Sequence, residues 1–166
     1  MNKLRTLLVV AGLGFFIDTA MAQEDTEYSR INDVPLVTEE TLGNLTAEGF
    51  RVILIYNSNQ NNDSYGDINR GIRVYIRILN EQKFIGFRYD TERLFQEGLV
   101  IKAEEVSDIL NNKFNVTKRP SIVAFCNGVQ TYALDGSAPK DESKMEVVNS
   151  YLVRNLSEAK KNCLEQ

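Results

Sequence analysis

A proline directly before an apolar run that ends in Asn-Gly constrains the fold more than any other feature. In "NVTKRPSIVAFCNG", Pro120 precedes the apolar residues 121–126, and Asn127 and Gly128 follow. Asn-Gly between two strand-like runs is a strong hairpin signal, so residues 129–134 are expected to return antiparallel. Proline cannot donate a ladder hydrogen bond and is rare inside central strands. The chain is therefore expected to turn sharply into its sheet at residue 120.

The rest of the chain alternates strand-like and helix-like segments. A continuous apolar run at 51–56 predicts a central strand covered on both faces. Residues 68–82 are ambiguous, because every second residue from Ile72 to Ile78 is apolar, yet Ile72, Ile76 and Leu79 share a helical face; the length favours a helix. The other expected elements are an edge strand at 34–37, a helix at 38–48, a strand at 83–90, a helical turn at 93–96, a helix at 103–114 and a helix from 141 to about 161. This order predicts an α/β fold whose central mixed sheet is flanked by helices on both faces.

The same order, with "FNVTKRPSIVAFCNGVQTYALDG", resembles the thioredoxin family. The specific part of the resemblance lies in Phe114, Val116, Pro120, the strand 121–126 and the Asn127-Gly128 pair; less specifically, it extends over most of residues 34–157. It implies a thioredoxin-like fold in which the bond before Pro120 is cis.

The resemblance also indicates which chemistry is missing. Redox members of the family carry C-x-x-C after the first central strand, where a helix N-terminus stabilises the reactive thiolate. The corresponding segment here, "NSNQNNDSYGD" at 57–67, contains no cysteine, and "RVILIY" before it lacks the buried acid of those enzymes. We therefore expect a non-catalytic member with no catalytic residue. The alternative is an atypical periplasmic thiol-disulfide oxidoreductase that uses Cys126 or Cys163.

The two cysteines and the missing histidines narrow the remaining functions. Cys126 and Cys163 could form one disulfide, or Cys126 could be a free thiol buried on its strand. The chain has no histidine, which excludes His-based triads and imidazole metal sites. We expect no metal site and no cofactor. The net charge of −4 argues against nucleic acid, which selects for basic patches.

The N-terminus predicts export. Lys3 and Arg5 precede an apolar run too short to cross a bilayer, and "AMA" at 20–22 suits a signal peptidase. No later run is long enough for a membrane span. We expect a cleaved signal peptide at 1–22, a flexible leader at 23–33, the thioredoxin-like domain at 34–162 and a short tail at 163–166. The expected location is periplasmic or secreted.

An exported scaffold without redox thiols is expected to bind protein. The groove beside the family's cis-proline accepts an extended peptide, and a cation beside a helix N-terminus suits an acidic group. We predict an anion-binding protein contact within an envelope complex, such as a secretion, conjugation or pilus apparatus. A lumenal, non-catalytic domain of the disulfide-isomerase type is a further alternative. The predicted binding residues are Lys118, Arg119 and Pro120 with Asn61, Asn62, Asp63, Ser64 and Tyr65.

Overall fold

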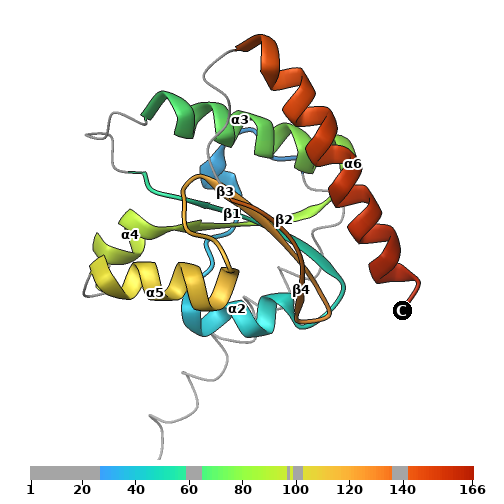
Figure 1. The fold of residues 1–166 in the computed structure, drawn as a ribbon. Helices are drawn as coiled ribbons and strands as arrows, with labels where there is room; N and C mark the ends of the chain where they lie inside the picture. The colour runs from blue at the N-terminus through green and yellow to red at the C-terminus, as the bar shows by residue number, and fades with distance from the viewer. Residues whose placement is uncertain (1–26, 59–64, 97, 99–102, 136–141) are drawn as a thin grey trace, which may run out of the picture.

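A four-stranded mixed sheet forms the centre of the molecule in the computed structural model (Figure 1). The structure describes residues 27–58, 65–96, 98, 103–135 and 142–166. The strands are β1 (Phe50–Tyr56), β2 (Ile85–Asp90), β3 (Ser121–Cys126) and β4 (Val129–Leu134), in the spatial order β2-β1-β3-β4. Strand β1 is parallel to β2 and antiparallel to β3, and β3 and β4 are antiparallel. The helices are η1 (Ile31–Asp33), α2 (Glu39–Thr46), α3 (Tyr65–Gln82), α4 (Thr91–Gln96), α5 (Ala103–Phe114), η2 (Glu142–Lys144) and α6 (Met145–Leu164).

Helices cover both faces of this sheet, as predicted. Side chains of β1 alternate between two apolar clusters, because successive residues of a strand point to opposite faces. Val52 and Leu54 pack with α3 and α6, whereas Ile53 and Ile55 pack with α2, α4 and α5 (Figure 1). Coverage on both sides explains why residues 52–56 are all apolar instead of alternating.

The ambiguous segment at 68–82 is helical and belongs to α3. Its Tyr75 is fully buried. The tyrosine hydroxyl lies 2.8 Å from the carbonyl oxygen of Val52 and 2.6 Å from that of Phe87, and it accepts a bond from the Phe87 amide at 3.0 Å. One side chain therefore joins α3 to both β1 and β2.

The segment before α2 is tied to the β2 edge of the sheet. The predicted edge strand at 34–37 is reduced to a single parallel bridge between Leu36 and Arg88. Its hydrogen bonds run from Val37 N to Arg88 O at 2.8 Å and from Arg88 N to Pro35 O at 2.9 Å. Pro35 cannot donate, which limits further pairing at this edge.

Residues just before this edge also contact the domain. Tyr28 is 2% exposed, and its backbone exchanges two hydrogen bonds with the Asn80 side chain, at 2.9 and 2.8 Å. These contacts hold Tyr28 against α3, within the segment 23–33 that the sequence assigned to a leader. Burying a large aromatic side chain is strongly favourable, so the Tyr28 ring anchors this part of the segment.

The Asn-Gly hairpin is present as predicted. Asn127 and Gly128 adopt φ values of 47° and 83°, the left-handed conformation that a two-residue turn of this type requires. The Asn127 side chain accepts a hydrogen bond from Gly49 N at 2.8 Å, and Gly128 N donates to Thr46 O at 2.6 Å. The hairpin is thus fastened to the turn between α2 and β1.

The final helix begins later than the sequence predicted. A 3-10 turn occupies Glu142–Lys144, and α6 starts at Met145 instead of residue 141. Lys144 at its N-cap makes no side-chain cap bond, so no strong start signal was present to read. At the other end α6 continues to Leu164, past the expected residue 161. No helix in the described part of the chain combines the length and apolarity needed to cross a membrane.

Candidate functional site

The loop before β3 contains the predicted cis bond, between Arg119 and Pro120. Pro120 is buried, whereas Lys118 and Arg119 are exposed. The proline ring packs against α3 at Gly71, where an added Cβ would lie 3.0 Å from the Pro120 Cγ. A glycine at this helix position lets α3 approach the loop closely.

Asp135 fixes the backbone of the same loop. Its Oδ2 accepts bonds from Thr117 N at 3.0 Å and from Thr117 Oγ1 at 2.7 Å, and its Oδ1 accepts from Lys118 N at 2.7 Å and from Ser121 Oγ at 3.3 Å. Desolvation alone would raise the pKa of Asp135, but these hydrogen bonds outweigh it and hold the pKa below its ordinary value. The carboxylate is therefore ionised at neutral pH and holds the loop from the end of β4.

The Arg119 side chain reaches α4. Its Nη1 donates to Thr91 Oγ1 at 2.7 Å, and that hydroxyl donates to Tyr56 O at 3.2 Å. The guanidinium is thus held by a neutral hydroxyl, and no ion pair joins it to a carboxylate within the described ranges. Its positive charge is fixed in position and exposed beside the cis-proline.

The other half of the predicted site cannot be compared. Residues 61–64 lie outside the described residues, and Tyr65 is described only as the first residue of α3. The structure therefore brings together Lys118, Arg119 and Pro120, while a contact between Arg119 and the 61–65 segment stays a prediction.

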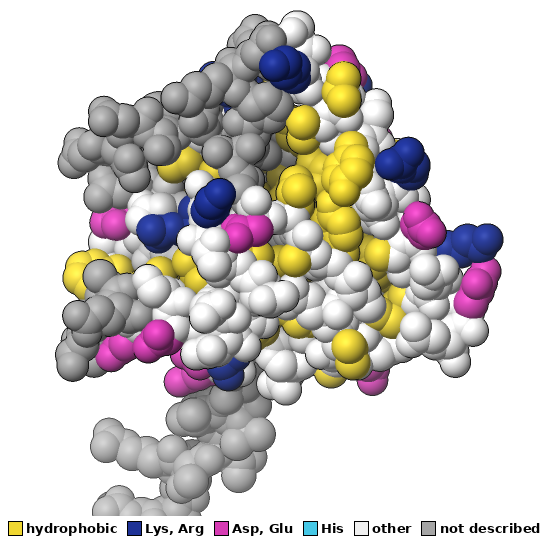
Figure 2. All heavy atoms as spheres, in the orientation of Figure 1, with side chains coloured by type: hydrophobic (Ala, Val, Ile, Leu, Met, Phe, Trp, Pro, Cys, Tyr) yellow, Lys and Arg dark blue, Asp and Glu magenta, His cyan; other side chains and the backbone are white. Residues whose placement is uncertain are grey.

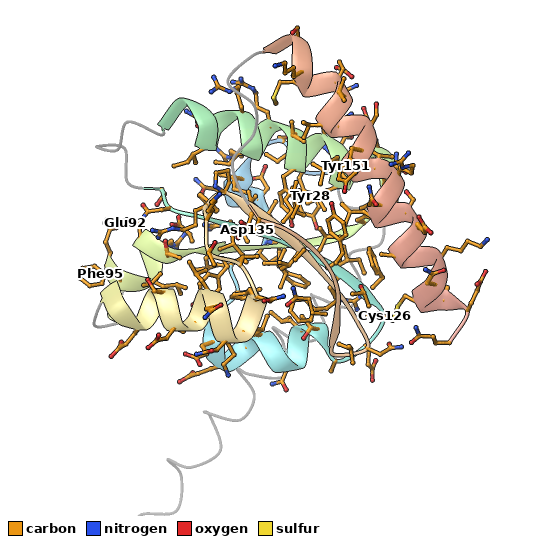
Figure 3. All side chains as sticks on the ribbon, viewed as in Figure 1. Tyr28, Glu92, Phe95, Cys126, Asp135 and Tyr151 are labelled. Carbon is orange, nitrogen blue, oxygen red and sulfur yellow. A yellow bond between two sulfur atoms is a disulfide. The ribbon has the colours of Figure 1, made fainter. Side chains whose placement is uncertain are left out.

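The chain's two cysteines form a disulfide at the opposite end of β3. Cys126 and Cys163 are joined with Cα atoms 5.6 Å apart, and the residues are 2% and 6% exposed. Cys126 is therefore part of a disulfide and not the free, buried thiol that the sequence also allowed. Pro120 and Cys126 bracket β3, so roughly 20 Å of extended chain separates them at about 3.3 Å per residue. Figure 3 shows Cys126 and Asp135 toward opposite ends of the hairpin strands.

This chain resembles known proteins in its three-dimensional structure and not in its sequence. No family model matches the sequence, and no curated protein matches it. Solved structures match over most of the chain. Spinach chloroplast thioredoxin f aligns with a TM-score of 0.52 at 11% identity, over 81% of this chain and 96% of its own. The chain has a thioredoxin-like fold.

Two yeast structures agree with this conclusion. A chain from a study of the thiol-resolving mechanism of yeast mitochondrial 1-Cys peroxiredoxin aligns with a TM-score of 0.51 at 13% identity, over 78% of this chain and 99% of that one. Mitochondrial thioredoxin 3 from Saccharomyces cerevisiae aligns with a TM-score of 0.50 at 12% identity, over 77% and 97%. At these identities the likeness concerns the thioredoxin-like fold alone.

Sequence reasoning missed three residues that shape this thioredoxin-like loop. Asp135, Thr91 and Gly71 come from three separate segments, and only the tertiary fold places them against the loop. Asp135 and Gly71 gave no signal that could be distinguished from an ordinary turn residue or helix glycine. Thr91 follows the charged end of an apolar strand, "FRYD", and that unusual placement of charge was the one usable hint.

Proposed function

We propose that this chain is an exported thioredoxin-like domain that binds protein and performs no thiol-disulfide exchange. The supporting observation is the position of its sulfur atoms. Both cysteines of the chain are consumed in a buried disulfide at the end of β3 remote from Pro120. Exchange requires an accessible thiolate, and this pairing leaves no cysteine to supply one beside the cis-proline.

The surface around Arg119 supports an acidic protein partner. Lys118 and Arg119 are adjacent, exposed cations, and Asp135 and Thr91 hold their loop in one conformation. A preorganised cation loses less conformational freedom on binding than a mobile one, so more of the attraction remains as affinity. We infer that carboxylate groups of a partner bind here, in a cell-envelope assembly such as a secretion, conjugation or pilus apparatus.

Site-specific crosslinking tests this proposal. A photoreactive amino acid placed at position 118 in cells that express the full chain should give discrete protein adducts, and the same probe at the exposed Glu158 on α6 should not. Arg119→Glu should abolish the adducts, whereas Arg154→Glu on α6 should leave them unchanged. Equal adducts from both probe positions, or adducts insensitive to Arg119→Glu, would refute the proposed surface.

The oxidoreductase alternative is tested separately. Native protein should contain no thiol that reacts with a colorimetric disulfide reagent, and it should not accelerate the reduction of insulin by dithiothreitol. Rapid reaction of Cys126 or Cys163 under native conditions would favour the enzyme. Export is tested by the N-terminal sequence of protein from cell fractions, which should begin near Gln23.

A further inference from the structure

A cleft opens where β1 and β2 end, next to the surface around Arg119: Tyr56 lines the cleft, and its carbonyl oxygen accepts a bond from the Thr91 hydroxyl that also holds Arg119. Its volume is about 390 Å³, within the range of small-molecule sites. Ligands of open α/β sheets commonly bind outside the carboxyl ends of the strands, and the cleft has this position. Its walls come from η1, α3, α4 and the ends of β1 and β2.

Arg88 is a buried cation in the wall of this cleft. It is 4% exposed, although a guanidinium carries five N–H donors that require acceptors. Its Nε donates to Val34 O at 2.8 Å, and its Nη1 makes a long contact of 3.4 Å with the Tyr56 hydroxyl. Within the described ranges no ion pair links it to a carboxylate. Burial of a charge without a counterion is costly.

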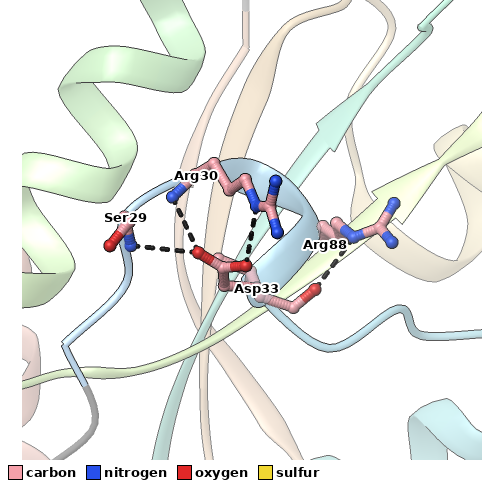
Figure 4. Close-up of polar contacts among 5 residues, drawn as sticks. Ser29, Arg30, Asp33 and Arg88 are labelled. Atoms are coloured by element: carbon pink, nitrogen blue, oxygen red, sulfur yellow. Dashed lines mark hydrogen bonds and ion pairs between the residues drawn. The ribbon is translucent and has the colours of Figure 1, made fainter.

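Neither Asp33 nor the hydroxyl of Tyr56 serves as a counterion for Arg88. The carboxylate of Asp33 is held by the backbone amides of Ser29 and Arg30 and by the Arg30 side chain, while both terminal nitrogens of Arg88 extend away from it (Figure 4). Burial, with a smaller contribution from the charge of Asp90, raises the pKa of Tyr56 to about 12. The phenol is therefore neutral at physiological pH.

Asp90, the buried carboxylate in the same cleft, contrasts with Arg88. It is 2% exposed, and its Oδ1 accepts backbone bonds from Ser58 at 3.1 Å, Glu92 at 3.2 Å and Arg93 at 3.4 Å. These donors include the first turn of α4, whose dipole also favours a negative charge. Asp90 therefore receives its hydrogen bonds from the protein backbone, whereas Arg88 has no carboxylate partner among the described residues.

We propose that this cleft binds a monocarboxylate with an apolar body. The carboxylate would accept the unused N–H groups of Arg88, a geometry that suits a planar fork. Ile31, Ile68 and Ile72 supply an apolar wall for the body of the ligand. Among the described lining side chains, Asp90 is held by backbone amides and Arg88 has no carboxylate partner, so Arg88 is suited to one negatively charged group. The carboxylate could belong to a free organic acid or to the C-terminus of a peptide that ends in an apolar residue.

Titration calorimetry with matched probes tests the cleft. Benzoate should bind the full chain saturably at one site, and benzamide, which has the same shape without the charge, should bind about tenfold more weakly or less. A second arm uses acetyl-Ala-Ala-Leu with a free or an amidated C-terminus. Binding of benzoate alone identifies a free acid, and binding of the free-terminus peptide identifies a chain end. Failure of both the benzoate and the peptide arm overturns the proposal.

Variants connect the binding to Arg88. Arg88→Gln should weaken the carboxylate probe that binds by about tenfold or more, whereas Arg154→Ala on α6 should leave its affinity unchanged. Because Arg88 also holds Val34, thermal unfolding must first show that the variant is folded. If it does not fold, the exposed Gln96 at the rim of the cleft is substituted instead. Gln96→Glu should lower the affinity for the probe and Gln96→Lys should raise it, each by about two- to fivefold. If Arg88→Gln folds and its affinity for the probe is unchanged, the proposed carboxylate site is wrong. If Arg88→Gln does not fold, unchanged affinity in both Gln96 variants has the same consequence.

Discussion

Strand β3 carries a covalent anchor at one end and a hydrogen-bonded loop at the other. At Cys126 the disulfide to Cys163 is buried, and the exposed Asn127 of the adjacent hairpin accepts a hydrogen bond from Gly49 N. At Ser121 the chain enters through Pro120 and exposes Lys118 and Arg119, with Asp135 holding their backbone. The two ends of β3 therefore differ in role. The disulfide end contributes stability and exposes no reactive thiol, and the cis-proline end exposes positive charge on a fixed loop.

Exposed apolar side chains occur on both sides of the sheet. Figure 2 shows apolar side chains gathered on the side that carries α6, where Val147 and Tyr151 are 69% and 46% exposed. On the far side of the sheet from α6, Glu92 and Phe95 project from α4 (Figure 3).

Removal of the disulfide should have the largest effect on stability. The bond spans 37 residues, and a cross-link of this span stabilises by about 3–4 kcal/mol through the unfolded chain. The double variant Cys126→Ala with Cys163→Ala should lose about that free energy of unfolding, measured by urea titration. Wild type with reductant present throughout the titration provides the control. A urea midpoint that does not move would show that the covalent anchor is dispensable.

The Asp135→Asn substitution should have the next largest effect. It removes the charge that accepts the bonds of Thr117, Lys118 and Ser121, and we expect a loss of about 1–2 kcal/mol at pH 7, reduced by solvent exposure. The pKa of Asp135 is lowered in the folded protein. Its stabilising effect is therefore full above the pKa of the unfolded chain, about 3.9, and is lost as pH falls through the folded value.

Unfolding measured from pH 7 down to pH 2 tests this pH dependence. The difference between wild type and Asp135→Asn should shrink toward the acid end. Asp108→Asn, at an exposed position on α5, is the matched control and should be close to neutral at every pH. A difference that stays constant with pH would assign the effect to packing instead of charge.

Substitution of Asn127 in the hairpin at the disulfide end should have an effect of similar size. Asn127→Ala loses the bond to Gly49 N and places alanine at a φ of 47°, so we expect a loss of about 1–2 kcal/mol. Asn127→Gly removes the same bond but tolerates the backbone conformation, so it should lose less. Chemical denaturation of the two variants side by side separates the hydrogen bond from the conformation. If glycine is as destabilising as alanine, the side-chain bond carries the whole effect.

Arg119→Ala should have the smallest effect on stability. The residue is exposed and its described bond is to a neutral hydroxyl, so the change should stay within about 0.5 kcal/mol. Its crosslinks to partner protein should nevertheless be lost, as for Arg119→Glu. A large loss of stability would mean that Arg119 belongs to the framework of the cis-proline end and not to a binding surface.

The sequence predicted the fold more completely than the site. The hairpin, the central strand and the helix at 103–114 follow from local signals such as Asn-Gly and periodic apolar residues, and the structure confirms each of them. The disulfide pairing depends on the distance between β3 and α6, which two isolated cysteines cannot reveal. The role of Arg88 was hidden for the same reason: in "KFIGFRYD" it occupies a strand position, and its burial depends on the packing of η1 and α3.

The Leu36 bridge limits how this sheet can associate. At the β2 edge the backbone N–H and C=O of Arg88 are paired by a short segment that contains Pro35, whereas β4 lies at the other edge. An open strand can accept a strand from another chain, and proline with a short segment discourages it. Strand addition is therefore expected at β4 before β2, because at β2 an incoming strand would first have to displace the segment bonded to Arg88.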